Sequence, residues 1–373
     1  MKALILRACV VAVCVAPLIF SADTSSSTAG SSSWSPQAAA SYLDSRLNWW
    51  AGWEQSARDH GTFCVSCHTV APYAAARLTL RAALAEQGPS PIERRILDDV
   101  TKRVRMWDEV EPYYPDATRG VPKTAESRGT ESILNAWVLV NYDAPKGTLS
   151  PDTRLALNNM WALQLKSGDA QGAWSWLQFH NQPWEGDSQF YGAALAAIAV
   201  GSTPASYKDT PEVKAGLQSL REYLVKNRDS QTLMDRVILL WASAKLPKLL
   251  STEDVKAKET IDEVFAKQQA DGGFSMTDLA AGWKRRDNTP LETKSDGYAT
   301  GVVAFVLQET GMPAGNPKLQ RALAWLAKNQ EKSDGRWLAY SMNKQRDLSS
   351  DIGRFMSDAA TAYAVLALNR AQR

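Results

Sequence analysis

The sequence predicts an all-α protein in which six helical hairpins follow one another in a closed ring. Three observations lead to this prediction. Alanine-rich helical segments recur in pairs, the pairs repeat at a period of about 50–60 residues, and several of their loops share a Gly-x-aromatic motif. A single hairpin of this kind cannot bury its apolar face alone, so we expect neighbouring hairpins to stack side by side.

Each predicted hairpin has an outer and an inner helix. The outer helices are amphipathic with one charged face, and we expect them at 37–57, 92–110, 151–166, 211–227, 252–269 and 317–329. The inner helices are apolar on nearly all sides, which is typical of buried helices. We expect them at 73–85, 131–142, 188–200, 233–244, 298–310 and 358–369.

The loops between outer and inner helices carry a common motif, which begins at Gly172, Gly272 and Gly335. The glycine allows the outer helix to end in a left-handed conformation, and we expect the aromatic residue to pack between neighbouring outer helices. An acidic residue follows each loop and is expected to open the inner helix, where it meets unpaired N–H groups. These acidic residues are Glu131, Asp187, Asp296 and Asp358.

Two of the loops carry the motifs QQADGGF at 268–274 and QEKSDGRW at 330–337. They resemble the QW and prenyltransferase repeats of the terpenoid cyclase/protein prenyltransferase superfamily, and the resemblance extends over residues 125–370. It implies an (α/α)6 toroid, but it does not bring the family's chemistry with it. Asp296-Gly297-Tyr298 lacks the cysteine of the prenyltransferase zinc site, and the DxDD acid motif of the squalene-hopene cyclases is absent from the sequence.

The composition excludes one class of partner. The formal net charge is only +2, and the chain contains no cluster of Lys and Arg of the kind that binds phosphate groups. We therefore expect no nucleic-acid partner. Tryptophan is abundant, with 14 residues, whereas only 3 histidines are available as metal ligands.

The N-terminus reads as an export signal. Lys2 and Arg7 precede an apolar run at 8–20, and small residues follow at 21–22. We interpret 1–22 as a signal peptide, 23–35 as a Ser-rich linker and 36–373 as the toroid. The expected location is the bacterial periplasm or the exterior, with no stable membrane span after cleavage, although the leader could also be kept as an anchor.

Cys64, Cys67 and His68 form a CxxCH, the spacing at which c-type haem is attached. Two thiols at this spacing can add to the two vinyl groups of one porphyrin, and His68 can bind the iron. We expect one covalent haem c per chain, with Cys64, Cys67 and His68 as cofactor-binding residues. A redox dithiol and a small metal site are the alternatives.

The haem motif fits two layouts. In the first, residues 35–125 form a separate small cytochrome c domain with Met106 as axial ligand. In the second, which we favour, the motif occupies the loop at 59–71 of the first hairpin, and Pro72 opens the inner helix. The haem would then lie at the mouth of the toroid, near the N-termini of the inner helices.

The loop of the third hairpin, residues 174–187, is expected on the same face as the CxxCH. It contains His180, a candidate distal iron ligand, and a cluster of aromatic residues that either fasten the loop or line a pocket. The other candidate sixth ligands are Met106, Met276, Met342 and Met356. Glu185 and Asp187 are the candidate acid–base pair if the protein is an enzyme.

Three functions remain open. The first is electron transfer by a mono-haem protein, and the second is oxidation of a small apolar substrate at an open iron site. The third is a cyclase-like enzyme or binding module that uses the Trp-rich loop. The expected partner is a redox protein in the first case and a small apolar molecule in the others.

Overall fold

Helices make up nearly all the regular structure of residues 34–179 and 188–372, which are the residues that this computed structural model describes. The one sheet among them is a hairpin of two short antiparallel strands, β1 (Ala57–Arg58) and β2 (Thr62–Phe63). The predicted all-α class is therefore confirmed. The predicted signal peptide at 1–22 and nearly all of the linker at 23–35 lie outside the described residues.

The six predicted outer helices are present. They are α1 (Pro36–Gly52), α3 (Pro91–Arg105), α6 (Pro151–Ala162), α9 (Pro211–Asn227), α11 (Ala257–Ala266) and α14 (Pro317–Lys328). Five of these six begin with proline, which suits the first helical turn because its missing N–H would have no intrahelical partner. Several of these helices end earlier than predicted. The difference is largest for α1 and α3, which end at Gly52 and Arg105.

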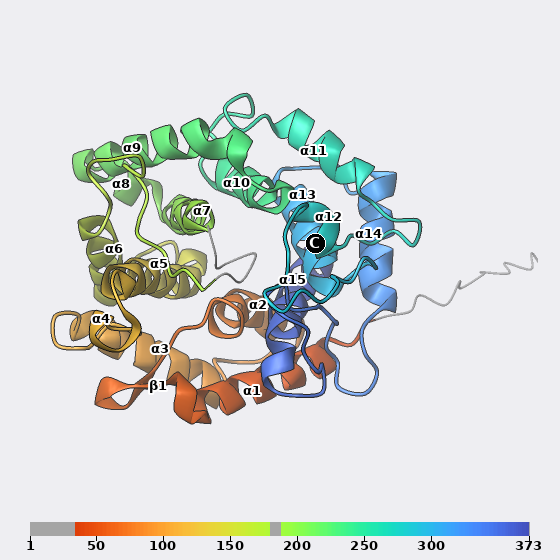
Figure 1. Cartoon of the computed structure of the whole chain (residues 1–373), viewed down its shortest axis with the longest axis horizontal. Helices are drawn as coiled ribbons and strands as arrows, with labels where there is room; N and C mark the ends of the chain where they lie inside the picture. Colours follow the sequence, from red (N-terminus) through yellow and green to blue (C-terminus); the bar gives the residue numbers. More distant parts are fainter. Residues whose placement is uncertain (1–33, 180–187, 373) are drawn as a thin grey trace, which may run out of the picture. The chain divides into compact units, whose positions relative to one another are not determined.

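The six predicted inner helices are also present. They are α2 (Val70–Ala83), α5 (Lys123–Asp143), α7 (Gln189–Gly201), α10 (Leu233–Lys245), α13 (Gly297–Glu309) and α15 (Phe355–Ala371). Each contacts the next in chain order, and α15 contacts α2, so the series of contacts is closed. Figure 1 shows the outer helices lying outside this series. Helix α1 contacts both α2 and α15, so the first hairpin packs against the last helix.

Short elements occupy the connections. They are the helices α4 (Asp116–Arg119), α8 (Ala205–Lys208) and α12 (Met276–Leu279), and the 3₁₀ turns η1 (Glu54–Ser56), η2 (Asp59–Gly61), η3 (Ala144–Lys146), η4 (Arg228–Ser230) and η5 (Ile352–Arg354). The inner helices supply much of the core. In α7, every residue from Phe190 to Gly201 is buried, as expected for a helix that is apolar on all sides.

A glutamine near each Gly-x-aromatic motif joins neighbouring outer helices. Its side-chain amide donates one hydrogen bond to the carbonyl of the motif's glycine and one to a backbone carbonyl in or beside the next outer helix. The three sets are Gln164 with Gly172 and Gly216, Gln268 with Gly272 and Lys318, and Gln330 with Gly335 and Ser35. The last set joins the loop after α14 to the residue before α1, so the three motifs make equivalent connections.

The aromatic residues of the motif are buried, as predicted. Trp174, Phe274 and Trp337 are each at most 1% exposed. The indole N–H of Trp174 donates to Met160 of α6, and that of Trp337 donates to Leu326 of α14, at 2.6 and 2.8 Å. Each of these two rings therefore fastens its loop to the preceding outer helix.

The predicted role of the motif's glycine is wrong in one respect. Gly172, Gly272 and Gly335 do have positive φ values of 92°, 96° and 82°. They lie several residues beyond the ends of α6, α11 and α14, however, so they form turns in the loops instead of ending the helices.

Not all of the acidic residues that were predicted to open the inner helices cap them. Asp296 is the N-cap of α13, and its carboxylate accepts from the backbone N–H groups of Tyr298 and Ala299, both at 2.9 Å. Glu131 is a correction, because α5 begins well before it, at Lys123. Asp358 does lie in the first turn of α15, which begins at Phe355, but its carboxylate accepts from side chains of other elements. Both of these side chains instead form buried ion pairs with arginines.

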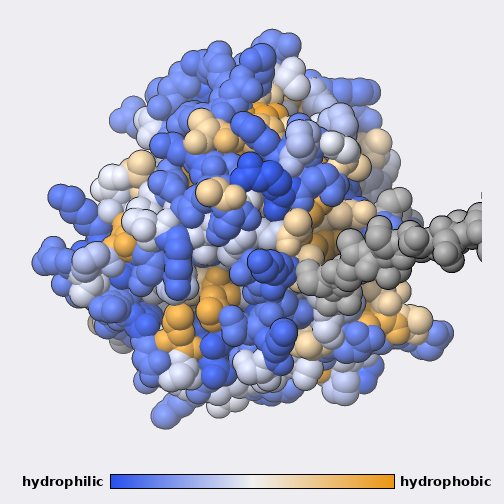
Figure 2. All heavy atoms as spheres, turned by 90° about the vertical axis from the view of Figure 1, so that its right-hand side faces the viewer, coloured by the Kyte–Doolittle hydropathy of each residue, from blue (hydrophilic) through white to orange (hydrophobic). Residues whose placement is uncertain are grey.

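The face of the molecule on the side of α14 matches the amphipathic pattern of the outer helices. The face shown in Figure 2, on the side of α14, is mostly hydrophilic, and its apolar residues lie in small separate groups. Within residues 34–179 and 188–372, no helix combines the length and the hydropathy needed to span a bilayer.

Candidate functional site

The CxxCH segment occupies the connection between α1 and α2. Cys64 follows β2 directly, and His68 stands two residues before the start of α2. The backbone of Cys64 is held on both sides, because its N–H donates to Ser56 and its carbonyl accepts from the indole of Trp50, each at 2.8 Å. The N–H of Val65 donates to the hydroxyl of Tyr113 at 3.1 Å.

Ser66 turns the segment into α2. Its hydroxyl accepts hydrogen bonds from the N–H groups of Thr69 and Val70, at 3.3 and 3.2 Å. Its carbonyl accepts from Ala71 at 3.0 Å. These bonds satisfy N–H groups that the first turn of a helix would otherwise leave without partners. Ser66 therefore sets the position of His68 relative to α2 through both its hydroxyl and its carbonyl.

A cluster of ion pairs links the residues just before the CxxCH segment to α3 and α5. Arg103, which is completely buried, donates to both carboxylate oxygens of Glu131 at 2.6 and 3.2 Å. It also donates to Asp59 and Thr62, at 3.0 and 2.8 Å. A guanidinium can serve two elements in this way because its donors are arranged in a rigid planar fork. Arg103 thus joins the β1–β2 hairpin to the inner helix α5.

Neither Cys64 nor Cys67 forms a disulfide. Cys64 is only 7% exposed. Burial, as the largest cause, raises the pKa of the Cys64 thiol to about 12. Reactive thiols have lowered pKa values instead, so its surroundings do not favour Cys64 as a reactive thiol.

The His68 ring is held by two aromatic side chains. Phe355, the first residue of α15, stacks on it with ring centroids 4.0 Å apart, and Trp50 meets it edge-on at 5.0 Å. Burial lowers the pKa of His68 to about 3, and Arg46 and Arg346 add to this effect. The imidazole is therefore neutral at physiological pH, which is the form that binds a metal.

A chain of hydrogen bonds selects the tautomer of His68. Its Nδ1 lies 2.8 Å from the hydroxyl of Thr69, which donates to Asp358 at 2.7 Å. The other oxygen of Asp358 accepts from Arg46 and Tyr42, both at 2.8 Å. Because the one proton of the Thr69 hydroxyl goes to the carboxylate, its oxygen accepts from His68. The proton of His68 is thus assigned to Nδ1 and the lone pair to Nε2.

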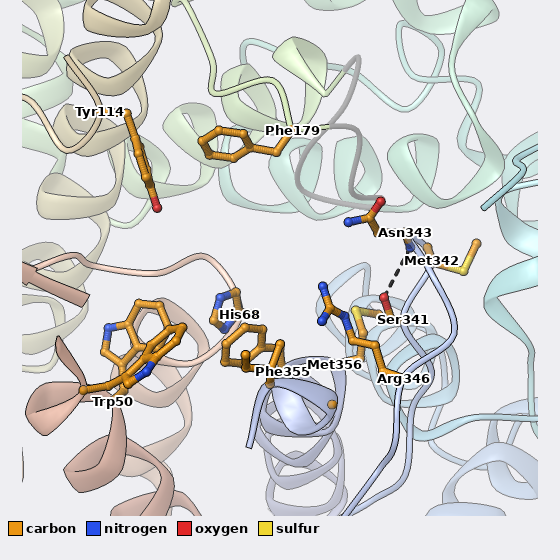
Figure 3. Close-up of a pocket in the computed structure, with 13 residues that line it drawn as sticks. Trp50, His68, Tyr114, Phe179, Ser341, Met342, Asn343, Arg346, Phe355 and Met356 are labelled. Atoms are coloured by element: carbon orange, nitrogen blue, oxygen red, sulfur yellow. Dashed lines mark hydrogen bonds between the residues drawn. The ribbon is translucent and has the colours of Figure 1, made fainter. Parts of the chain in front are cut away.

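A hollow of about 300 Å³ adjoins His68. Figure 3 shows Tyr114 and Phe179 on one side of it and His68 with Phe355 on the other, while Arg346 extends toward the space between them. The wall is mostly apolar and includes two methionines. The full lining is Trp50, Trp53, His68, Tyr114, Phe179, Ser341, Met342, Asn343, Arg346, Ile352, Gly353, Phe355 and Met356.

A smaller hollow of about 40 Å³ borders both cysteines of the motif and His68. It shares four lining residues with the larger one: Trp50, His68, Tyr114 and Phe179. The two sulfur-bearing side chains and the imidazole therefore border adjacent spaces with shared aromatic walls.

These residues fit a covalent haem. Cys64 and Cys67 would carry the porphyrin, His68 would present Nε2 to the iron, and the aromatic walls suit a flat apolar macrocycle. Arg346 is a cation on the same wall that suits a carboxylate such as a propionate. The larger hollow alone reaches the lower end of the range of about 300–1,000 Å³ that is typical of ligand pockets.

Only some of the other predicted site residues lie beside His68. His180, Glu185 and Asp187 lie outside the described residues, so their predicted roles stay predictions. Met342 and Met356 line the larger hollow, whereas Met106 and Met276 line neither hollow.

The aromatic residues of the third loop serve two purposes. Trp174 and Trp176 are at most 2% exposed, and Trp176 packs so closely on Gly192 that a Cβ there would lie 2.3 Å from the indole. Both belong to the core. Phe179 instead lines both hollows. The described part of the loop thus both fastens the chain and contributes to the site.

Sequence reasoning missed Thr69, Arg46 and Phe355. Thr69 directly follows the CxxCH, so its position beside the histidine was a usable signal. Arg46 and Phe355 reach the site from α1 and α15, and no local pattern marks them.

Within the described ranges, no group of three or more His, Cys, Asp or Glu side chains lies close enough to hold a metal ion. A scan against models of known protein families and a search of curated proteins found no match to this chain.

Proposed function

We propose that this chain is an exported mono-haem c-type protein. Cys64 and Cys67 carry the haem through thioether bonds, and His68 is the proximal iron ligand. The observation that supports this most strongly is that both cysteines and His68 border adjacent hollows with shared aromatic walls. The tautomer of His68, with its lone pair on Nε2, agrees with this role.

The proposed fold is an (α/α)6 toroid. The closed series of contacts among the inner helices supports it, as do the equivalent glutamine hydrogen bonds between neighbouring outer helices. The haem would lie beside the N-terminus of α2, in the loop of the first hairpin. Residues 36–373 would then form one toroid, without a separate cytochrome domain at 35–125.

A bound haem would supply one-electron chemistry at its iron. The protein's residues orient and insulate that centre. Thr69 and Asp358 hold the imidazole through Nδ1, and partners of this kind orient a metal-ligating histidine and increase its basicity. Trp50 and Phe355 restrict rotation of the ring, and Tyr114 and Phe179 line the space beside it.

Electron transfer is the role we favour. In that role the iron has a second protein ligand, for which His180 is the candidate from the sequence. Met342 and Met356 are the two described alternatives, because both are buried at 3% exposure and both line the hollow beside His68. The partner would be another redox protein, in the bacterial periplasm or outside the cell.

A second candidate is a haem-dependent oxidoreductase with an open iron site. The mostly apolar residues around the hollow next to His68 favour it, because a small apolar substrate beside the bound haem would lie against aromatic and aliphatic side chains. Glu185 and Asp187 are its candidate acid–base residues. A cyclase-like module has less support, since Trp174 and Trp176 are packed in the core.

A pyridine haemochrome assay tests the proposal. The full chain, with residues 1–22, is expressed in a bacterium that has c-type haem-attachment machinery and is purified from the periplasm. We expect one haem per chain and a reduced-minus-oxidised difference spectrum of c type. A folded, colourless protein would overturn both haem functions. Low-spin haem would support electron transfer, whereas high-spin haem that binds carbon monoxide would support the oxidoreductase.

A further inference from the structure

Two neighbouring loops carry an excess of positive charge. They are residues 281–294, between α12 and α13, and residues 341–354, which lead into α15. Together they contain seven Lys and Arg residues but four Asp and Glu residues, whereas the whole chain contains 42 and 40. The net positive charge of these two loops is therefore greater than that of the entire chain.

Hydrogen bonds join the two loops to each other. The indole N–H of Trp283 donates to the carbonyl of Met342 at 2.7 Å. The backbone N–H of Arg286 donates to the carbonyl of Asn343 at 2.8 Å. Met342 and Asn343 also line the larger hollow beside His68. These bonds therefore hold the charged loops next to that hollow.

Three cations of these loops line a further hollow of about 340 Å³. We call these residues, Arg286, Lys344 and Arg346, the basic patch. The rest of the lining is Asp287 and Asn343, so three positive charges face one negative charge there. Arg346 and Asn343 also line the larger hollow beside His68, and Figure 3 shows both at its edge. The basic patch therefore adjoins the proposed haem site.

Two cations of the basic patch, Arg286 and Lys344, are exposed and form no ion pair among the described residues. The acid beside them is engaged elsewhere, because Asp287 accepts from the backbone N–H of Gln345 at 2.8 Å and from the hydroxyl of Thr289 at 2.6 Å. Carboxylates of another molecule can therefore pair with Arg286 and Lys344 without displacing an internal ion pair.

An exposed apolar side chain accompanies the basic patch. Ile352 is 38% exposed and lines the larger hollow beside His68. Interfaces between proteins combine apolar contacts with a polar rim in which opposite charges face each other. A small anion would use the cations alone, so the presence of Ile352 on the same side of the site favours a protein as the partner.

We infer that the basic patch is the docking surface for an acidic face of the redox partner protein. This inference rests on the proposed electron-transfer function. Arg286 and Lys344 attract acidic side chains of the partner, and Ile352 makes an apolar contact with it. Complementary charges of this kind mainly raise the rate of association, and their effect falls as salt is added. The partner's redox centre is thereby brought to the side of the hollow that adjoins His68.

The oxidation of the reduced holoprotein by ferricyanide tests the charge of this surface. Ferricyanide is a trianion that takes up one electron and becomes ferrocyanide, and stopped-flow absorbance of the haem follows the reaction. We expect the rate to fall as the ionic strength rises, whereas the rate with the cation tris(1,10-phenanthroline)cobalt(III) should rise. At an ionic strength of about 0.1 M, charges act mainly within about 10 Å. Under these conditions Arg286→Glu and Lys344→Glu should each lower the ferricyanide rate about two- to fivefold.

Binding of fluorescein-labelled poly-L-glutamate, followed by fluorescence anisotropy, tests docking of an acidic polypeptide without using the haem as the readout. Arg286→Glu and Lys344→Glu should each weaken this binding by a factor of about two to five. The matched control is Lys248→Glu. Lys248 is also an exposed lysine, but it follows the end of α10 and lines none of the hollows near His68, so both measurements should stay unchanged.

The two proposals fail in different ways. A chain that carries no haem would overturn the proposed function, and this inference with it. In a chain that carries haem, the inference alone is overturned if Arg286→Glu and Lys344→Glu leave either measurement unchanged, or if Lys248→Glu reduces both as strongly.

Discussion

The hydroxyl of Thr69 donates a 2.7 Å hydrogen bond to Asp358, across 289 residues of chain. It joins the CxxCH loop of the first hairpin to the last helix, α15. On its other side the same hydroxyl lies 2.8 Å from Nδ1 of His68. The orientation of the proposed iron ligand therefore depends on the packing of α15 against α1 and α2.

Asp358 connects this arrangement to α1 through Arg46. Both side chains are at most 2% exposed, and Nε of Arg46 lies 2.8 Å from the carboxylate. Burial raises the pKa of Asp358, while hydrogen bonds from Arg46, Thr69 and Tyr42 act in the opposite direction. A buried charge pair of this kind is costly to break from one side, because the remaining charge stays buried.

We predict that Asp358→Ala lowers the free energy of unfolding by about 3–5 kcal/mol, measured by urea denaturation. The control is Arg105→Ala. It removes an exposed ion pair with Asp152, in which the arginine side chain is 64% exposed, and should cost far less than Asp358→Ala because solvent screens the pair. Similar losses in the two variants would show that the network around Asp358 does not stabilise the fold.

Gly335 tests the contact between the last Gly-x-aromatic loop and the first helix. It has a φ of 82°, and a Cβ there would lie 2.5 Å from the backbone of Ala38 in α1. We predict that Gly335→Ala destabilises the protein by at least about 2 kcal/mol in thermal or urea unfolding, because both the backbone and the contact are strained.

Gly315 provides the matched control for this substitution. A Cβ there would have no heavy atom within 4 Å, and its φ is not positive. Gly315→Ala should be neutral or stabilise the protein by up to about 1 kcal/mol. If Gly335→Ala behaves in the same way, the loop does not pack against α1 as described.

The buried carboxyl of Asp235 should make the stability of the protein depend on pH. It is 3% exposed, its Oδ2 accepts from Thr232, and burial raises its pKa to about 6. In the unfolded chain the pKa of an aspartate is about 3.9. At a pH between the unfolded and the native pKa, the native state therefore binds more protons than the unfolded state. This group's contribution to stability is therefore complete below about pH 4 and is lost as the pH rises through about 6.

We predict that Asp235→Asn removes this dependence. Between pH 4 and 7, the free energy of unfolding of the wild type relative to the variant should fall by about 3 kcal/mol. Urea denaturation of both proteins across this range measures the difference. Parallel stability curves for the two proteins would mean that the carboxyl of Asp235 does not titrate in the way described.

The spin state of the haem tests the proposed sixth ligand. His180→Ala should convert a low-spin spectrum to a high-spin one, because it removes an axial ligand. Met106→Leu is the control, since Met106 lines neither hollow beside His68, and its spectrum should not change. An unchanged spectrum of His180→Ala would contradict this assignment. The same comparison of Met342→Leu and Met356→Leu would then identify the ligand.

Much of the helical fold could be predicted from the sequence because its signals are local. Pro211 and Asn227 bound α9 as predicted, since proline, amphipathic spacing and length all lie within one segment. The early end of α1 at Gly52 could not be predicted. The sequence after it continues a helical pattern, but the chain turns there into the β1–β2 hairpin. This hairpin is bound to α3, because the backbone N–H of Phe63 donates to the buried carboxylate of Asp99.

The site could be predicted only where its residues are adjacent in sequence. The CxxCH indicates Cys64, Cys67 and His68 directly. Phe355 could not be assigned to the site, because its contact with His68 depends on how α15 packs against α1 and α2. Asp358 was expected to cap a helix, and its true partner, Arg46, is buried with it in the core.

The central claim is that Cys64 and Cys67 hold a haem covalently. The most direct measurement is the intact mass and haem absorbance of the denatured polypeptide, purified from a host that attaches c-type haem. We predict that the wild-type chain keeps one haem after denaturation, and that the Cys64→Ala/Cys67→Ala double variant keeps none. A wild-type chain that carries no haem, or that loses it on denaturation, would contradict the account.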